Sequence, residues 1–242
     1  MKTAAIVLSG GRGLRFGSDI PKQYMEIGGK SILAHAVSAF EMSEADEIVI
    51  VAAQEHIERC REIVRSSRFE KVADVIPGGA ERYDSVLMGL RYLMNREREI
   101  PEIVLIHDGA RPFIRPETVG EIIRCVAEHG AAIAAAPCTD TIKIADENGC
   151  IVTTTERKKT WAAQTPQAFR TEEIFRAYET VIGKGSPENL TGITDDAMVY
   201  QMAFPGACVK LVNAGTQNFK ITAADDMIRA ESMLSAHCGK QC

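Results

Sequence analysis

The sequence contains no apolar run that approaches the roughly 20 residues needed to span a membrane. Its first residues, MKTAAIVLSGG, include an apolar stretch that is too short for a signal peptide and leads directly into glycines. We interpret this stretch as a buried first strand, and we expect a cytoplasmic protein without a membrane partner. The chain also lacks internal repeats, low-complexity tracts and linkers, so we expect a single domain over residues 1–242.

The seven cysteines show neither metal-ligand nor redox spacing. Scattered thiols of this kind are typical of a reducing compartment, where disulfides are rare. A basic excess is also missing, because 33 Asp and Glu outnumber 28 Lys and Arg and give a net charge of −5. A general nucleic-acid binder would show a basic face, so we expect no nucleic-acid partner. Locally concentrated positive charge can still bind a small polyanion.

Buried strands and amphipathic helices alternate through the first half of the chain. Four apolar runs indicate strands, at residues 4–8, 48–52, 72–76 and 103–106. Apolar residues recur at helical spacing between them, after Ser31, after Glu55 and from Asp84 or Ser85 onward. This alternation predicts an α/β fold of Rossmann-like type, a mostly parallel sheet flanked by helices. Ligands bind beyond the carboxyl ends of the strands in such sheets, so the loops there should form the site.

The alternation ends after Ala136. Residues 141–145 and 151–155 alternate polar and apolar side chains around Asn148-Gly149, which is a strong signal for a β-hairpin. A hairpin that projects from a parallel sheet has exposed edges. We therefore expect residues 138–158 to form an arm that packs on a second subunit of a homodimer. Beyond the arm we expect helices from about residues 171, 195 and 223 and a strand at 208–212.

The first strand runs into a loop rich in glycine and positive charge, SGGRGLRFGSDIPKQY, from Ser9 to Tyr24. Its glycines let the backbone approach phosphate oxygens, and Arg12, Arg15 and Lys22 add cations to the same segment. The spacing matches neither the Walker A motif nor the dinucleotide-binding GxGxxG. A plain glycine turn with solvated basic side chains is the alternative.

The third strand ends in GGAERYDS, residues 78–85. Glycines there could admit the flat edge of a base, and Ser85 at a helix start offers a hydroxyl and free N–H groups. An ordinary helix cap is the alternative interpretation.

The fourth strand ends in HDGARPF, residues 107–113. Asp108 at a strand end suits Mg²⁺, which prefers one or two carboxylates together with substrate phosphates. Arg111 could orient Asp108 or bind a phosphate bidentately, and a buried Asp–Arg pair that only fixes the loop is the alternative. We interpret His107 as structural, because phosphoryl-type transfer needs little proton handling by the protein.

Three later segments contain further polar side chains: TWAAQTPQAF at 160–169, ITDD at 193–196 and QNFKIT at 217–222. We expect the last of them to end a strand at Lys220. Taken singly, each segment is explained equally well by helix caps and polar loop residues.

Together these segments resemble the 2-C-methyl-D-erythritol 4-phosphate cytidylyltransferases of non-mevalonate isoprenoid synthesis. The resemblance covers essentially the whole chain, and its motifs follow the family's order: SGGRGLRF, PKQY, GGAERYDSV, HDGARPF, DTIK, AQTPQAF, TDD and NFKIT. The first motif is shared by many nucleotidyltransferases, whereas PKQ, HDGARP and TPQ in this order are more specific. The resemblance implies a fold of the nucleotide-diphospho-sugar transferase type. It also implies an enzyme that joins CTP to the sugar-alcohol phosphate and releases pyrophosphate.

The resemblance also implies roles for individual residues. The triphosphate would be bound, and charge on the α-phosphate stabilised, by Arg15, Lys22 and Lys220. Mg²⁺ would be held by Asp108. The nucleotide and its base would lie against Ser9, Gly10, Gly11, Gly13, Gly79, Ala80 and Ser85. The sugar phosphate would contact Arg111, Thr165 and Thr194, joined by Thr141 and Arg157 from the partner's arm.

The chain departs from the family at three positions. Ser9 stands where alanine is usual, which places a hydroxyl beside the expected base site. Ala80 stands where an acidic residue is common, and Gln217 where some members carry a carboxylate. The last departure leaves a second protein ligand for the metal in doubt.

Two other functions remain open. Ribitol 5-phosphate cytidylyltransferases share PKQ and TPQ, although they more often carry HDSVRP where this chain has HDGARP. A non-catalytic nucleotide-binding regulatory protein could use the same fold. Such a protein would not need Arg15, Lys22, Asp108 and Lys220 together.

Overall fold

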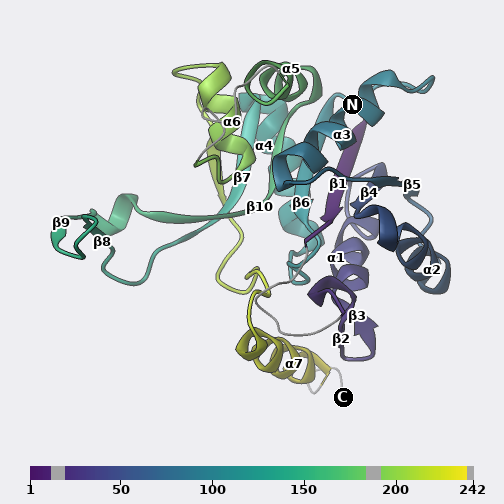
Figure 1. Cartoon of the computed structure of the whole chain (residues 1–242), viewed down its shortest axis with the longest axis horizontal. Helices are drawn as coiled ribbons and strands as arrows, with labels where there is room; N and C mark the ends of the chain where they lie inside the picture. The colour runs from purple at the N-terminus through teal and green to yellow at the C-terminus, as the bar shows by residue number, and fades with distance from the viewer. Residues whose placement is uncertain (12–19, 184–191, 239–242) are drawn as a thin grey trace.

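The computed structural model describes residues 1–11, 20–183 and 192–238. Gly13 and Arg15, which are expected to bind nucleotide, lie outside these residues. The described chain forms a seven-stranded sheet in the order β11-β7-β10-β6-β1-β4-β5 (Figure 1). Its strands are β1 (Thr3–Ser9), β4 (Glu47–Ala52), β5 (Val72–Pro77), β6 (Ile103–Asp108), β7 (Ala131–Pro137), β10 (Trp161–Arg170) and β11 (Lys210–Asn213).

The predicted parallel sheet is confirmed, with one antiparallel strand inside it. β1 pairs in parallel with β4 and β6, and the edge strands β5 and β11 pair in parallel with β4 and β7. β10 lies antiparallel between β6 and β7. In the sequence we assigned no strand to the corresponding segment, residues 160–169, for which caps and polar loop residues were an equally good explanation. The strand was missed because Gln164, Thr165 and Gln167 are buried polar residues that interrupt the apolar pattern of a central strand.

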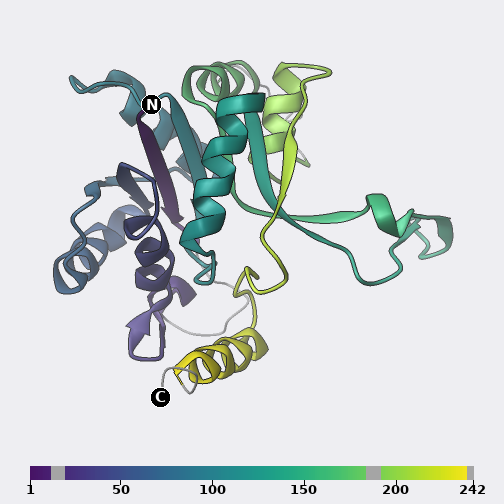
Figure 2. The same ribbon diagram turned by 180° about the vertical axis from the view of Figure 1, so that it is seen from behind.

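Helices cover both faces of the sheet (Figures 1 and 2). Alternate residues of β1 point to opposite faces, with Ala5 and Val7 in one core and Ala4 and Ile6 in the other. The first core is closed by α1 (Ile32–Glu41), α2 (Ile57–Ser67) and α4 (Pro116–His129). The second is closed by α3 (Arg82–Asn95), α5 (Thr171–Val181) and α6 (Asp196–Ala203).

The helix starts follow local capping chemistry. Ser31 caps α1 as predicted, because its Oγ accepts a hydrogen bond from the Ala34 N–H at 3.1 Å. The start expected at Asp84 or Ser85 was wrong, since α3 already begins at Arg82. Glu81 and Asp84 form a capping box there, with each side chain accepting from the other's backbone N–H.

The predicted hairpin is present and extends away from the sheet (Figure 1). β8 (Lys143–Ala145) and β9 (Ile151–Thr154) pair antiparallel around a turn in which Gly149 has a φ of +80°. The Asp146 carboxylate accepts hydrogen bonds from the N–H groups of Asn148 and Cys150 at 3.0 and 2.8 Å, which closes the turn. η3 (Arg157–Lys159) then leads the chain back into β10.

A small third cluster lies beside the first loop. β2 (Glu26–Ile27) and β3 (Lys30–Ser31) form a two-stranded ribbon after the 3-10 turn η1 (Lys22–Tyr24), and α7 (Ala224–Cys238) packs on this ribbon. Ile27, Ile32, Ile221 and Ala230 form its buried centre. No helix in the described segments has the length and apolar character that a membrane crossing requires.

Candidate active site

Two adjoining cavities lie at the carboxyl ends of β1 and β6, where ligands of parallel sheets bind. The larger, of about 730 Å³, is lined by eight of the expected residues: Gly10, Gly11, Lys22, Gly79, Ala80, Ser85, Asp108 and Lys220. The smaller, of about 290 Å³, is lined by five of them: Asp108, Arg111, Thr165, Thr194 and Lys220. Three residues line both cavities: Arg82, Asp108 and Lys220. The loops that we singled out in the sequence therefore meet in space.

Glycine is required where Asp108 projects into the cavities. Gly109 follows it, and a β-carbon at this position would lie only 2.7 Å from the carbonyl oxygen of Leu8. The Gly109 N–H instead donates to that oxygen at 2.8 Å, which ties the end of β6 to the end of β1. The close approach fixes the backbone beneath Asp108.

The loop before α3 is held by Ser85. Its Oγ accepts a hydrogen bond from the Gly79 N–H at 3.1 Å and donates to the Glu81 carbonyl at 3.1 Å. The expectation that Ser85 stands at the helix start with free N–H groups was wrong, because α3 begins at Arg82 and the Ser85 N–H donates to the Glu81 carbonyl at 3.1 Å. Ser85 is only 5% exposed, and its contacts shape the loop where Gly79 and Ala80 line the larger cavity.

Gln23 joins the glycine loop to the turn that carries Lys22. Its Nε2 donates to the carbonyl oxygens of Ser9 and Gly11 at 2.8 and 3.0 Å, and its side chain is almost fully buried. We did not identify Gln23 from the sequence as a site residue, although it is the third residue of the PKQY motif. One amide group thus sets the spacing between the glycine backbone and Lys22.

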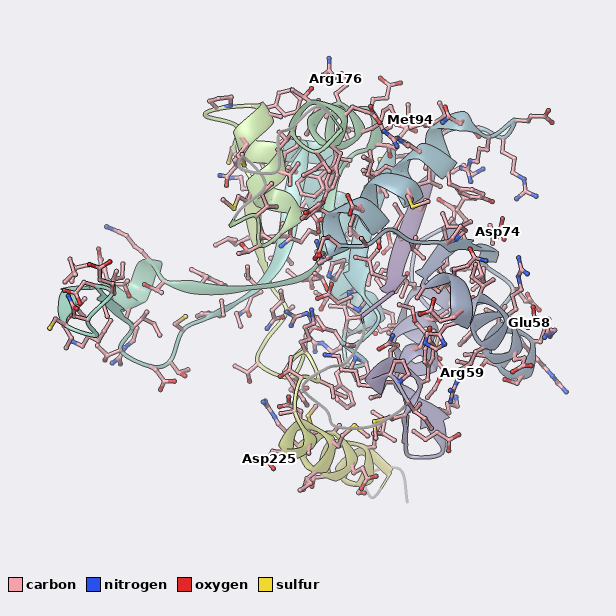
Figure 3. The ribbon with its side chains drawn as sticks, viewed as in Figure 1. Glu58, Arg59, Asp74, Met94, Arg176 and Asp225 are labelled. Carbon is pink, nitrogen blue, oxygen red and sulfur yellow. The ribbon has the colours of Figure 1, made fainter. Side chains whose placement is uncertain are left out.

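The hydroxyl of Ser9 points away from the larger cavity. It donates to the Tyr24 hydroxyl at 3.1 Å, and that oxygen lies 3.4 Å from Cys60 Sγ. Burial raises the pKa of both Tyr24 and Cys60. Arg59 of α2, labelled in Figure 3, covers the Tyr24 ring at 5.0 Å. The expectation that the Ser9 hydroxyl lies beside the base was therefore wrong. Ser9 is 1% exposed and belongs to this buried cluster.

Asp108 is surrounded by three cations. Its Oδ1 accepts from Arg82 Nε at 3.1 Å, while its Oδ2 lies 2.9 Å from Lys220 Nζ and 3.7 Å from Arg111 Nε. Burial opposes ionisation of this carboxyl, but the three cations outweigh it and hold the pKa of Asp108 well below its ordinary value. Asp108 is thus an ionised carboxylate at a strand end, and it pairs with Arg111, as one of the interpretations of this loop held.

Lys220 reaches Asp108 from a loop rather than a strand. β11 ends at Asn213, so the expected strand end at Lys220 was wrong. Two backbone contacts position the loop: Arg111 Nη1 donates to the Asn218 carbonyl at 2.9 Å, and the Ile221 N–H donates to the Ala110 carbonyl at 2.9 Å. The segment after β11 is therefore fastened to the segment after β6.

His107 is structural, as the sequence interpretation held. Its ring is fully buried, and burial lowers its pKa to about 4, so the imidazole is neutral near pH 7. Nε2 lies 3.0 Å from the Arg111 carbonyl and Nδ1 lies 3.1 Å from Thr165 Oγ1. Since a carbonyl can only accept, the proton is assigned to Nε2, and Nδ1 accepts from the Thr165 hydroxyl.

Thr141 and Arg157 lie on the arm, and neither is among the residues that line the two cavities. Both are exposed, and Arg157 Nη2 donates to Thr141 Oγ1 at 2.7 Å. The two residues that the resemblance groups together are therefore neighbours, although the single chain does not bring them to the site.

Comparison with known proteins gives a consistent result. Residues 3–236 match the sequence profile of the IspD family, described as 2-C-methyl-D-erythritol 4-phosphate cytidylyltransferase. The enzyme of that name from Lachnospira eligens is 42% identical over 224 residues, covering 92% of this chain and 95% of the relative. The one from Alkaliphilus metalliredigens is 39% identical over 245 residues, covering 100% and 97%.

Solved structures agree with the sequence relatives. The 4-diphosphocytidyl-2C-methyl-D-erythritol synthase from Anaerococcus prevotii matches with a TM-score of 0.83 at 28% identity, over 97% of this chain and 96% of that one. The Francisella tularensis 2-C-methyl-D-erythritol 4-phosphate cytidylyltransferase matches with a TM-score of 0.75 at 26% identity, over 96% and 99%. On these matches in sequence and structure, the chain belongs to the 2-C-methyl-D-erythritol 4-phosphate cytidylyltransferase family of nucleotidyltransferases.

Proposed function

We propose that this chain joins CTP to 2-C-methyl-D-erythritol 4-phosphate, forming 4-diphosphocytidyl-2-C-methyl-D-erythritol and pyrophosphate. One observation carries the proposal: a larger and a smaller cavity meet at Asp108 and Lys220. The larger cavity has room for a nucleoside triphosphate against Gly10, Gly79 and Lys22, and the smaller one suits a sugar phosphate. The two substrates would then meet where the cavities join.

The reaction is an in-line attack by an oxygen of the sugar phosphate on the α-phosphorus of CTP. A new P–O bond forms as the bond to pyrophosphate breaks, and pyrophosphate carries away the negative charge. Because two polyanions must approach, the main task is to neutralise charge and align oxygens. Lys22 and Lys220 supply cations at the cavity, and we assign the same role to Arg15.

No general base is required, because a phosphate monoester is mostly deprotonated near neutral pH. The buried, neutral His107 is accordingly left with a structural task. Its hydrogen bonds to Arg111 and Thr165 hold two residues of the smaller cavity in place.

The residues present fit a bound Mg²⁺, which we propose as the cofactor. Asp108 is an ionised carboxylate that lines both cavities, and the substrate phosphates would supply further oxygen ligands. Within the described residues no group of three or more His, Cys, Asp or Glu forms a protein-only metal cage. When bound, the metal would neutralise charge on the phosphates of CTP.

We further propose a homodimer in which each arm completes the partner's site. The arm exposes Ile144, Ile151 and Val152 by 50%, 65% and 67%, and burying these apolar side chains against a partner would stabilise a dimer. The hydrogen-bonded pair of Arg157 and Thr141 would add a cation and a hydroxyl to the sugar-phosphate site.

A cytoplasmic location is part of the proposal and suits the free thiols of Cys60 and Cys125.

The test is pyrophosphate release with CTP, Mg²⁺ and one of two acceptors. We expect release with methylerythritol phosphate and little with ribitol 5-phosphate. Release with ribitol 5-phosphate alone would identify the sister activity and refute the proposed acceptor. Binding of CTP without release from either acceptor would favour the regulatory function instead.

A further inference from the structure

Arg82 connects two carboxylates that come from distant parts of the chain. It begins α3, whereas Asp108 ends β6 and Asp196 begins α6. Arg82 Nε donates to Asp108 Oδ1 at 3.1 Å, and Nη1 and Nη2 donate to Asp196 Oδ1 and Oδ2, each at 2.8 Å. Arg82 also lines both cavities, yet the proposed roles of Lys22, Lys220 and Asp108 leave it without a task.

Asp196 is a buried anchor for this arginine. Its side chain has no exposed surface, and its Oδ1 accepts a further hydrogen bond from the Tyr178 hydroxyl at 2.5 Å. A carboxylate in such a place is stable only when it is paired and hydrogen-bonded. The bidentate pair therefore fixes the guanidinium plane of Arg82, and it does so from the side away from the substrates, because Asp196 lines neither cavity.

The two oxygens of Asp108 have partners of different rigidity. Oδ1 is held by Arg82, whose guanidinium is clamped on Asp196. Oδ2 faces Lys220, a long side chain that is 38% exposed, and Arg111 at the longer distance of 3.7 Å. Lysine presents a compact charge on a flexible stem, whereas arginine presents a rigid fork of donors. Any exchange of partners at Asp108 is therefore easier at Oδ2 than at Oδ1.

We propose that Arg82 is a positioning residue for Asp108: anchored on Asp196, it fixes Oδ1 and leaves Oδ2 to face the incoming nucleotide and its metal. This inference rests on the proposed function. It explains why an arginine stands between the cavities with most of its donors turned to the protein. A carboxylate that is already oriented does not have to be ordered when the ligand binds. Lysine could not replace Arg82, because one ammonium cannot hold both carboxylates in this geometry.

The test uses Asp196→Asn, since Asp196 lines neither cavity and its side chain contacts the cavity lining through Arg82. Asparagine preserves size and still accepts from Tyr178, but it loses the charge and one acceptor oxygen. Titration calorimetry would measure the Kd of CTP with Mg²⁺ and with EDTA. The Kd in EDTA divided by the Kd with Mg²⁺ reports the contribution of the metal. We expect the variant to lower this ratio by about tenfold or more, as is usual when the partner of a metal ligand is lost. The Kd measured in EDTA should change little.

Glu47→Gln is the matched control. Glu47 forms a bidentate pair of the same kind with Arg96, with side chains 9% and 8% exposed, and it lines neither cavity. We expect it to lower the midpoint of thermal unfolding as Asp196→Asn does, while the metal ratio stays at the wild-type value. This control separates loss of a buried ion pair from loss of the link to Asp108.

Arg82→Lys provides a second variant if Asp196→Asn does not fold. The same selective loss of the metal ratio is expected, because lysine keeps the charge but not the fork. Equal weakening of CTP binding with Mg²⁺ and with EDTA would instead mean that Arg82 contacts the phosphates directly, and it would overturn the positioning role. An unchanged ratio in a folded variant of an active enzyme would overturn it as well. A wild-type protein that releases no pyrophosphate would refute the proposed function itself.

Discussion

The Thr165 hydroxyl accepts a hydrogen bond from the backbone N–H of Asp108 at 3.0 Å. This contact links antiparallel β10 to the end of β6. It occurs where the pairing of β10 with β7 shifts register between Ala163 and Gln167, a bulge of the kind often found beside active sites. Because the same hydroxyl donates to His107, its proton is already committed within the protein. We therefore expect Thr165 to act on the substrate mainly by holding Asp108, although it also lines the smaller cavity.

Thr165→Val removes this hydroxyl at nearly constant volume. The Asp108 N–H and His107 Nδ1 would lose their partner in a buried place, which costs about 1–3 kcal/mol for each unsatisfied group. We expect a lower midpoint of thermal unfolding together with slower pyrophosphate release. Thr165→Ser retains the hydroxyl and should stay close to wild type in both assays. A stable Thr165→Val enzyme with raised KM for the sugar phosphate alone would show that direct substrate contact dominates.

Much of this site could be predicted from the sequence because strand-end loops of a parallel sheet converge. The glycine loop, Asp108 and Arg111 follow apolar strands directly, so their meeting requires only the alternation of strands and helices. Thr165 and Arg82 are different. Each acts through a partner far along the chain, namely Asp108 for the first and Asp196 for the second, and no local pattern contains that pairing.

Side-chain direction was also beyond the sequence. Ser9 is the last residue of β1, and strand residues alternate between the two faces of the sheet. The backbone conformation at this one residue decides whether its hydroxyl faces the cavity or Tyr24. Likewise, the capping box that begins α3 places Ser85 inside the helix rather than at its start. Such choices depend on packing against neighbours that the sequence does not place.

Lys22→Ala should slow pyrophosphate release by about 10²–10³-fold, the usual effect of removing one group that stabilises transition-state charge. Lys22 lines the larger cavity on a turn that the Gln23 side chain ties to the Ser9 and Gly11 carbonyls, so the fold should persist. Lys210→Ala on β11 is a charge-matched control, since Lys210 is exposed and lines neither cavity. Steady-state assays and thermal unfolding of both variants would check this. Turnover near wild type in Lys22→Ala would contradict the assigned role.

Ser9→Ala should leave nucleotide choice unchanged. The hydroxyl contacts Tyr24 rather than the larger cavity, and the Tyr24 hydroxyl would still donate to the Ser9 carbonyl at 3.3 Å. We expect the variant to lose about 1 kcal/mol of stability or less, the net value of one hydrogen bond. Denaturant unfolding, together with kcat/KM for CTP and for UTP, would measure both effects. A large shift in the CTP preference would place the hydroxyl at the base instead.

Mixing two inactive variants would test whether the arm serves the partner's site. Arg157→Ala damages the arm, whereas Lys22→Ala damages the body of the subunit. If each arm completes the other subunit's site, a mixed dimer contains one site with both defects and one with neither. Co-refolded equal mixtures should then regain about a quarter of wild-type turnover, since half of the dimers are mixed and each has one intact site.

If each arm served its own subunit, every site in the mixture would still carry one defect, and no activity would return. Size-exclusion chromatography of both variants provides the control. Neither substitution changes the exposed apolar residues of the arm, Ile144, Ile151 and Val152, through which we expect the dimer to form. Both variants should therefore elute at the volume of the wild type, which the proposed homodimer predicts to be that of a dimer. If two dimeric, separately inactive variants regain activity when mixed, each arm contributes to the site of the other subunit. If no activity returns, the arm does not complete the partner's site.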